Sequence, residues 1–390
     1  MIPYGRQSVS TEDIRAVTEV LNSDFLTQGP VVPAFEKAVS MYCGVEYAFA
    51  VNSATSALHL ACLALGVGKG DVVWTSPITF VASANCALYC GAQVEFVDID
   101  NQTYNLSVSA LEDRLLNAQK EGRLPKVVIP VHLAGQSCQM DKIYELSKKF
   151  GFRIIEDASH AIGGKYNGKA IGGCQYSDIT VFSFHPVKII TSGEGGMCVT
   201  NDQHLAITIN RLRSHGIVRQ ASEMKHVPDG PWYYEQIDLG YNFRMTELQA
   251  ALGLSQLKRL DEFVKSRHKI ATFYNEILKE DWIELPYQHE DTYSSFHLYI
   301  IRIKVNDLGV THRQLFEKLR NSGILVNLHY IPVYRHPFYE SFGYNRKEFP
   351  NSELYYSEAI SIPIYATLTA EEQQFVADKI KRPSGFQNLF

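Results

Sequence analysis

Seven short apolar runs, most of them separated by stretches with helical periodicity, constrain the fold of this chain most strongly. They span residues 47–51, 72–75, 94–97, 127–131, 153–156, 180–184 and 197–200. Several runs are apolar at every position, which is typical of strands that helices cover on both faces. The pattern predicts an α/β fold with a central, mostly parallel sheet of about seven strands.

The length of 390 residues and the pattern beyond the seventh run suggest two domains. We expect a large domain at 1–262 and a smaller C-terminal α/β domain at 263–390, joined by one long helix over 245–268. Other expected elements are a helix at 11–21, a loop at 220–234, a strand at 297–305, a helix at 311–322, a strand at 324–328 and a loose tail from Arg382.

Lys188 follows the apolar run 180–184, in a turn that contains Pro186 and leads to glycines at 193, 195 and 196. Most lysines are solvated surface charges, but a lysine at the end of a buried strand can be held still and desolvated. Burial lowers the pKa of the amine and frees it to attack a carbonyl carbon. The segment therefore favours a Schiff-base lysine.

Asp157 ends another apolar run, 31 positions before Lys188, which leaves room for one crossover and one further strand. A carboxylate at the C-terminal end of a strand points into the crevice where α/β proteins bind ligands. Such an acid suits the ring nitrogen of pyridoxal phosphate, because it keeps that nitrogen protonated. The alternative is that Asp157 only caps the next helix.

A third segment, residues 47–58, leads from a strand through a turn rich in small and hydroxyl side chains into a helix. Free N–H groups at a helix N-terminus bind phosphate, and the hydroxyls of Thr55 and Ser56 would add donors. An ordinary cap by Ser53 or Thr55 is compatible with that role. Phe80 follows the next strand and could stack on a planar ring, although core packing is the commoner use of phenylalanine.

Together, these segments supply a phosphate cradle, an acid for a ring nitrogen and a lysine for an aldehyde. The chain resembles the DegT/DnrJ/EryC1/StrS family of sugar aminotransferases, which have the fold-type I architecture and depend on pyridoxal phosphate. The resemblance covers nearly the whole chain, in segments 2–7, 26–29, 52–57, 156–161, 182–188, 193–196, 213–216, 240–245 and 326–330.

This resemblance implies roles for individual residues. Lys188 would hold the cofactor covalently and act as acid and base, Asp157 would pair with the pyridinium nitrogen, and His160 would lie near the ring hydroxyl. Phe80 would stack on the ring, where many relatives have tryptophan. The cofactor phosphate would be bound by Thr55, Ser56, Ser183 and, from a neighbouring subunit, Asn242. The residues implied at the sugar-nucleotide site are Tyr4, Arg6, Gln28, Gly29, His185, His329 and Tyr330.

The resemblance also implies a reaction. Segments 213–216 and 250–258 favour the subgroup that moves an amino group, most often from glutamate, to C4 of a UDP-linked 4-keto-6-deoxy-N-acetylhexosamine for pseudaminic acid. A dTDP-linked substrate or amination at C3 remains an alternative. A sugar 3-dehydratase of the same family would have histidine in place of Lys188, which argues against that activity. A non-catalytic cofactor-binding paralogue is the third alternative.

Composition restricts the partners. The net charge of −5, with no basic arm, argues against nucleic acid binding. No signal pattern or apolar run of membrane-spanning length is evident, so we expect a cytoplasmic protein and, from the family, a homodimer. The seven cysteines are odd in number and scattered, which is typical of free thiols in a reducing compartment, and none has the spacing of a metal site.

The sequence does not match three common functional motifs. Residues 163–170 nearly spell a phosphate-binding P-loop but end in Ala170 where Ser or Thr is needed, so a tight hairpin is expected instead. No G-x-G-x-x-G follows the first strand, and no G-x-S-x-G elbow occurs. His132, at a strand end, is left without a role because a lone histidine is more often structural.

Overall fold

Seven strands form the central sheet of the computed structural model, which describes residues 1–304 and 311–381. In spatial order they are β2 (Tyr47–Val51), β10 (Gly196–Thr200), β9 (Ile179–Ser183), β6 (Arg153–Asp157), β5 (Val127–Ile129), β3 (Val72–Thr75) and β4 (Gln93–Phe96). Strand β10 runs antiparallel to both of its neighbours, and the other neighbouring pairs are parallel. The predicted seven-stranded, mostly parallel sheet is therefore confirmed.

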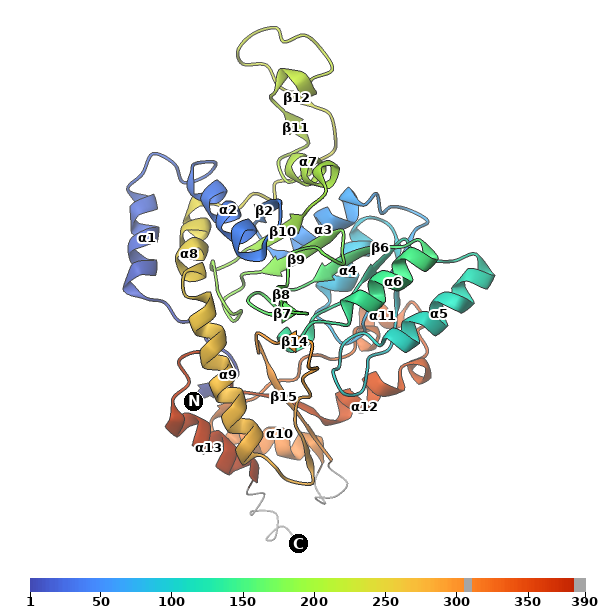
Figure 1. Cartoon of the computed structure of the whole chain (residues 1–390), viewed down its shortest axis with the longest axis vertical. Helices are drawn as coiled ribbons and strands as arrows, with labels where there is room; N and C mark the ends of the chain where they lie inside the picture. The colour runs from blue at the N-terminus through green and yellow to red at the C-terminus, as the bar shows by residue number, and fades with distance from the viewer. Residues whose placement is uncertain (305–310, 382–390) are drawn as a thin grey trace.

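Helices cover both faces of this sheet, which explains the continuously apolar strands (Figure 1). In the β9 segment, Ile179 and Val181 pack on one side and Phe182 and Phe184 on the other, as the two-residue period of a strand requires. One side is covered by α3 (Ala54–Ala64), α4 (Ala82–Tyr89) and α7 (Gln203–Leu212), and the other by α2 (Val31–Cys43), α8 (Glu247–Leu257), α5 (Val108–Glu121) and α6 (Met140–Phe150).

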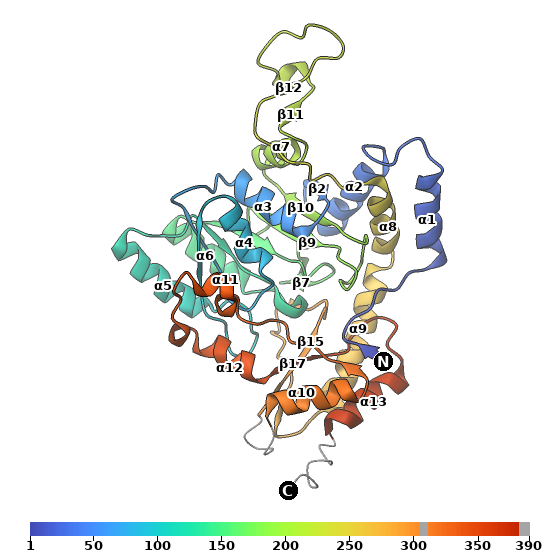
Figure 2. The ribbon, with the colours of Figure 1, turned by 180° about the vertical axis from the view of Figure 1, so that it is seen from behind.

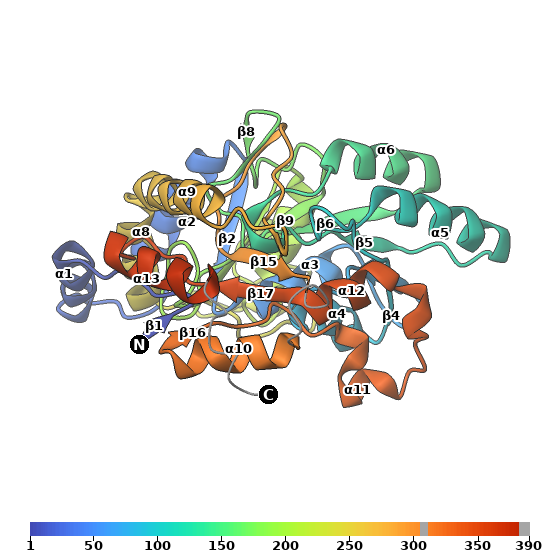
Figure 3. The ribbon, with the colours of Figure 1, turned by 90° about the horizontal axis from the view of Figure 1, so that it is seen from below.

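The C-terminal part has its own core around a three-stranded antiparallel sheet. Its strands lie in the order β13 (Ile283–Glu284), β15 (Tyr299–Ile303) and β17 (Ala359–Ile362), packed with α9 (Leu260–Ile277), α10 (His312–Asn321) and α13 (Ala370–Lys381). Figure 3 shows α10 and α13 beside these strands. Strand β1 (Ile2–Pro3) pairs with β16 (Ile324–Leu325), so the N-terminal segment lies against the C-terminal part.

The predicted single helix over 245–268 is wrong. Two helices, α8 and α9, meet at Arg259, whose backbone (φ −108°, ψ 8°) is not helical. The Arg259 guanidinium pairs with the buried carboxylate of Asp13 at 2.6 Å and donates to the carbonyl of Ser8 at 3.2 Å. Asp13 belongs to α1 (Thr11–Leu21), the expected opening helix. A tertiary ion pair therefore accompanies the break, and no local sequence signal marks it.

The predicted loop at 220–234 forms most of an arm that stands away from the body of the molecule (Figures 1 and 2). Strands β11 (Ile217–Val218) and β12 (Glu235–Gln236) pair at the base of the arm. The Glu235 carboxylate accepts hydrogen bonds from the backbone N–H groups of Lys225 (2.6 Å) and His226 (2.8 Å). The arm thus folds around one carboxylate while Trp232 remains 74% exposed.

Of the other local predictions, some are confirmed and some need corrected bounds. The hairpin expected at 163–170 is confirmed as β7 (Lys165–Tyr166) and β8 (Lys169–Ala170), which β14 (Thr292–Tyr293) extends. The strand expected at 324–328 is shorter, at β16, and the strand expected at 297–305 is β15. Val305 and the tail from Arg382 lie outside the described residues. Two short helices, α11 (Pro337–Glu340) and α12 (Pro350–Glu358), complete the C-terminal part.

Within the described ranges, no helix combines the length and the apolar character that crossing a bilayer requires.

Candidate active site

A cavity of about 1170 Å³ lies where the carboxyl ends of β6 and β9 meet the first turns of α3 and α4. The segment from Asn327 to Ile331 and the side chain of Tyr4 close its other side. Ligands of open α/β sheets bind at this edge, because loops and helix N-termini converge there. Most of the residues implied at the cofactor and substrate sites line this cavity: Tyr4, Thr55, Ser56, Phe80, Asp157, His160, Ser183, His185, Lys188, His329 and Tyr330.

Lys188 sits in a turn closed by the hydrogen bond from its backbone N–H to the carbonyl of His185, at 2.9 Å. Burial of the amine lowers the pKa of Lys188 to about 8, and the negative charge of Asp157 opposes that shift. Roughly one tenth of the amine is therefore neutral at pH 7, far more than for an ordinary solvated lysine, and the neutral form is the one that attacks a carbonyl carbon.

Asp157 ends β6 and is only 4% exposed. Its carboxylate accepts hydrogen bonds from the Ser83 hydroxyl at 2.6 Å and from the backbone N–H of Ser159 at 3.1 Å. The Ser83 and Thr79 hydroxyls lie 2.8 Å apart, so a short hydroxyl chain supports the acid. A carboxylate oriented in this way can accept a hydrogen bond from a protonated nitrogen of a ligand in the cavity.

The start of α3 forms a cradle rich in N–H and hydroxyl groups. Ser53 caps the helix, because its hydroxyl accepts from the N–H of Ser56 at 3.1 Å, and the Ser56 hydroxyl donates to the Asn52 side chain at 2.7 Å. Gly196 of β10 is in close contact with this turn, since a Cβ there would lie 2.5 Å from the backbone nitrogen of Ala54. Such a helix N-terminus suits an anionic phosphate.

His160 links the wall of the cavity to Tyr330. The N–H of Ala134 donates to Nδ1 of His160 at 3.3 Å, and Nε2 lies 3.0 Å from the Tyr330 hydroxyl. Because Nδ1 is an acceptor here, the proton of the neutral ring is on Nε2. Burial, followed by the nearby charge of Lys188, holds the pKa of His160 well below its usual value, in agreement with a neutral ring.

His329 is also buried. Its Nδ1 lies 2.8 Å from the Ser361 hydroxyl, and its ring packs 4.7 Å from that of Tyr4. Burial, and then the charge of Lys188, lowers the pKa of His329 to about 3, so this ring is neutral as well. Phe80 lies at the mouth of the cavity with 58% of its surface exposed, 6.2 Å from the Tyr330 ring.

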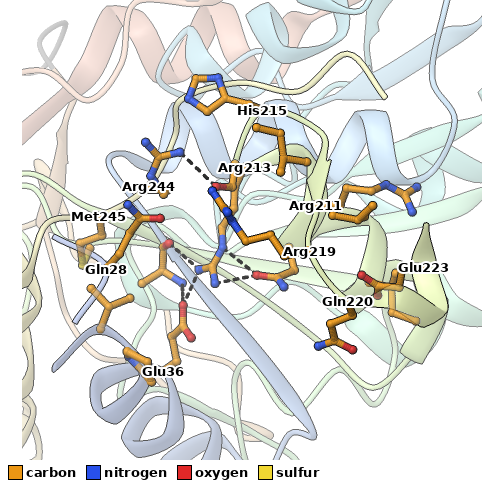
Figure 4. A pocket seen from close by; sticks show the side chains of 18 of the residues that line it. Gln28, Glu36, Arg211, Arg213, His215, Arg219, Gln220, Glu223, Arg244 and Met245 are labelled. Carbon is orange, nitrogen blue, oxygen red and sulfur yellow. Dashed lines mark hydrogen bonds and ion pairs between the residues drawn. The ribbon is translucent and has the colours of Figure 1, made fainter. Parts of the chain in front are cut away.

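Four implied residues do not line this cavity in the single chain: Arg6, Gln28, Gly29 and Asn242. Arg6 and Asn242 are exposed. Gln28 and Gly29 line a second cavity of about 570 Å³, shown in Figure 4. Arginines crowd this second cavity, hereafter the arginine cavity: Arg211, Arg213, Arg219 and Arg244.

Two of these arginines are balanced by acids. Arg213 pairs with Glu36, and Arg211 lies 2.6 Å from Asp238. Arg244 donates to the Ser214 hydroxyl at 3.0 Å, and Arg219 lies over the Tyr234 ring at 5.0 Å. For the latter two, the described part of the chain provides no carboxylate within ion-pair distance. Glu223 also lines this cavity, but the four arginines outnumber Glu36, Asp238 and Glu223, so the arginine cavity carries an excess of positive charge.

Sequence reasoning missed several residues of the site. Ser83 and Thr79 support Asp157, and Asn52 accepts the Ser56 hydroxyl bond. His297 is buried with its ring 4.4 Å from that of His160. Thr79 and Ser83 are four positions apart, a spacing close to one helical turn, and this spacing could have identified the two hydroxyls as a pair. His297 gave no such signal, because it lies just before β15 and reaches the site from 137 positions beyond His160.

A test of the lysine follows from its shifted pKa. In the protein freed of any aldehyde, reductive modification of Lys188 by a small aldehyde should reach half its maximal rate near pH 8, because the neutral amine reacts. Replacing Asp157 by asparagine removes a charge that favours the ammonium form, so the midpoint should move to lower pH. Peptide mass analysis after borohydride quenching measures both. A midpoint that is unchanged or higher in the Asp157→Asn protein would contradict this electrostatic coupling.

Comparison with known proteins agrees with this geometry. The model of the DegT/DnrJ/EryC1/StrS aminotransferase family matches residues 7–381, and the chain belongs to that family. It is therefore an aminotransferase-family enzyme with the α/β fold of pyridoxal-phosphate-dependent transferases.

Individual relatives are similar over almost their whole length. The UDP-4-amino-4,6-dideoxy-N-acetyl-beta-L-altrosamine transaminase of Campylobacter jejuni (strain 81-176) is 40% identical over 382 residues, covering 97% of this chain and 96% of the relative. The structure of Helicobacter pylori PseC, an aminotransferase of pseudaminic acid biosynthesis, is 34% identical with a TM-score of 0.89 and 98% coverage of both chains. The PLP form of Spr1654 from Streptococcus pneumoniae is 28% identical with a TM-score of 0.86 and 97% coverage of both.

Proposed function

We propose that this protein is a pyridoxal-phosphate-dependent aminotransferase that aminates C4 of a UDP-linked 4-keto-6-deoxy-N-acetylhexosamine, with glutamate as amino donor. The observation that carries the cofactor assignment is the meeting of three groups in one cavity. These are the Lys188 amine with its lowered pKa, the Asp157 carboxylate and the hydroxyl-rich start of α3. The free state of all seven cysteines agrees with a reducing, cytoplasmic setting.

The chain fits pyridoxal phosphate by the chemistry of its donors. When bound, this cofactor supplies an electrophilic carbonyl carbon and a ring that accepts an electron pair. Lys188 would hold it through that carbon and, once released, would move the proton of the amino donor. Asp157 would keep the ring nitrogen protonated. Thr55, Ser56 and Ser183 would bind the phosphate, and Phe80 would cover one ring face.

The substrate class rests on the relatives and on the two cavities. The C. jejuni relative is named for a UDP-linked 4-amino sugar. A diphosphate linker needs cationic partners, and the arginine cavity offers Arg219 and Arg244 for it. His185, His329, Tyr330 and Tyr4 would then surround the sugar, with Arg6 near the entrance.

A substrate test follows from this proposal. With glutamate as donor, the UDP-linked 4-keto sugar should give a kcat/KM at least about tenfold higher than its dTDP-linked or 3-keto counterparts. Mass spectrometry of the amino sugar and assay of 2-oxoglutarate measure the reaction. Double-reciprocal plots with donor and sugar both varied should be parallel, because the amino group is held on the enzyme between two half-reactions. Intersecting lines would contradict that scheme.

We also propose that two copies of the chain share each active site. Asn242 and the arginine cavity lie outside the Lys188 cavity of the same chain, although both carry residues implied at that site. A two-fold partner would bring them together. The arm and the segment that follows it, with Trp232 74% and Leu239 79% exposed, offer apolar surface for that contact.

Mixing two impaired proteins tests the shared site. Neither Lys188→Ala nor Asn242→Ala alone should be fully active, but mixed dimers contain one site with both residues intact. With random subunit exchange, about one quarter of the wild-type sites should be restored. A mixture of Lys188→Ala with Asp157→Asn, two residues of the same cavity, is the matched control and should restore nothing. Equal recovery in both mixtures, or none in either after confirmed exchange, would contradict shared sites.

A further inference from the structure

Glu156 and Asp157 are consecutive buried carboxylates that point to opposite faces of the central sheet. Before them in β6, Ile155 packs in the core with α3 and α4, and Ile154 packs in the core with α5 and α6 on the other face. By the two-residue period of a strand, Asp157 lies on the face of Ile155 and Glu156 on the face of Ile154. Asp157 lines the cavity of Lys188, whereas Glu156 lines a separate cavity of about 630 Å³. The proposed function uses Asp157 and gives Glu156 no role.

Three donors hold the Glu156 carboxylate, and they come from both neighbours of β6. Oε2 lies 2.8 Å from Nε2 of His132, three positions after β5. Oε1 accepts hydrogen bonds from the hydroxyl of Thr180 in β9, at 3.2 Å, and from that of Ser177, two positions before β9. Burial disfavours the charge, but these hydrogen bonds outweigh that effect and hold the pKa of Glu156 below its usual value. We call these four residues the carboxylate clamp.

His132 is fully buried and is also fixed at its other ring nitrogen. The backbone N–H of Cys138 donates to Nδ1 at 3.1 Å. Burial opposes a charge on the ring, but the hydrogen bonds with Cys138 and Glu156 outweigh it and raise the pKa of His132. Nε2 therefore keeps its proton and donates it to Glu156.

The backbone of His132 contacts the next residue of β6. The Asp157 N–H donates to the carbonyl of Pro130 at 2.9 Å, and the Asp157 carbonyl accepts from the N–H of His132 at 3.1 Å. His132 thus holds two consecutive residues of β6, Glu156 through its ring and Asp157 through its backbone. Because both contacts come from one residue, the position of the ring and the position of the Asp157 backbone are coupled.

We propose that Glu156 and His132 are positioning residues that hold the end of β6, and with it the Asp157 carboxylate, at a fixed place beside the reactive amine. Thr180 stands opposite Glu156 in the register of β6 and β9, and β9 leads into the turn of Lys188. The clamp therefore joins the strand of the acid to the strand of the lysine, on the face opposite the cavity. The benefit for catalysis rests on the proposed function, whereas the link from the clamp to Asp157 and Lys188 is a property of the chain itself.

The Lys188 amine, in the protein freed of any aldehyde, reports on this positioning. The pH midpoint of its reductive modification should fall when Asp157 is replaced by asparagine, and the size of that fall measures how closely the carboxylate is held. His132→Leu removes the donor to Glu156 and should reduce the fall to less than about half. His132→Gln, whose amide N–H can still reach Glu156, should retain most of it.

Two further variants keep this test independent of one substitution. Thr180→Val removes one hydroxyl donor with little change of shape and should also reduce the fall. Asp98→Asn is the matched control, because Asp98 is a buried carboxylate that accepts two backbone N–H groups at 3.0 Å and does not line the cavity of Lys188. It should lower the thermal unfolding midpoint and leave the fall unchanged. An unchanged fall in folded His132→Leu and Thr180→Val proteins would overturn the proposal.

Turnover provides the second measurement. With Asp157 present, His132→Leu should lower kcat about tenfold. In the Asp157→Asn background, it should cause little further loss, because a residue that acts through Asp157 has no charge left to position. Losses of equal size in both backgrounds would contradict the proposal. A folded wild-type protein without turnover would contradict the proposed function instead, and the measurement on the free amine would still decide this inference.

Discussion

Replacing Lys188 by alanine is expected to lower kcat by at least about 10⁴-fold, because one side chain both holds the cofactor and moves the proton. A methyl group can neither attack a carbonyl carbon nor carry a proton. The cavity that Lys188 lines should remain, since its walls come from β6, α3, α4 and the segment 327–331. The variant should therefore still bind pyridoxal phosphate, but without a covalent bond.

Borohydride reduction followed by peptide mapping separates these two effects. Wild-type protein should carry a phosphopyridoxyl group on Lys188, and the Lys188→Ala protein should carry none there. Lys169→Ala removes an exposed lysine of the β7–β8 hairpin and is the matched control, with full activity and normal labelling expected. Substantial turnover by Lys188→Ala, or labelling of the wild type at another lysine, would contradict the proposed role of Lys188.

Replacing Asp157 by asparagine is expected to lower kcat by about 10²- to 10³-fold, the loss expected when one partner of a buried charge pair is removed. Asparagine has nearly the same shape, and its side-chain oxygen can still accept the 2.6 Å hydrogen bond from Ser83. The fold should therefore survive. The variant lacks the negative charge that would keep a ring nitrogen protonated, so the ring would accept electrons less readily.

Ser83→Ala is the graded control for this effect. It removes the hydrogen bond that orients Asp157 but keeps the charge, so we expect a loss of about tenfold in kcat. Single-turnover rates of each half-reaction, together with thermal unfolding of both variants, distinguish a chemical defect from a folding defect. An Asp157→Asn protein that is folded and as active as Ser83→Ala would show that the charge of Asp157 is unimportant.

Local patterns were sufficient for the framework of the molecule. Each of the seven apolar runs lies in or overlaps a strand of the central sheet. A strand that is buried on both faces is apolar at every position, so its pattern can be recognised without knowledge of distant contacts. The opening helix at 11–21 was equally clear, with a capping box between Ser10 and Asp13. The break between α8 and α9 was not, because it coincides with contacts of Arg259 to Asp13 and Ser8, about 250 positions away.

The proposed site shows the same division. The three segments that carry Lys188, Asp157 and the α3 turn could be predicted from local sequence, since each is a strand end followed by a turn. The domain boundary at 262–263 stays a prediction. Three features became evident only in the folded chain: Ser83 holds Asp157, His297 lies beside His160, and Gln28 and the arginines line a cavity of their own. The periodicity of strands and helices depends on residues that are close in sequence. These contacts depend instead on which strand ends and helix faces the packed core brings together.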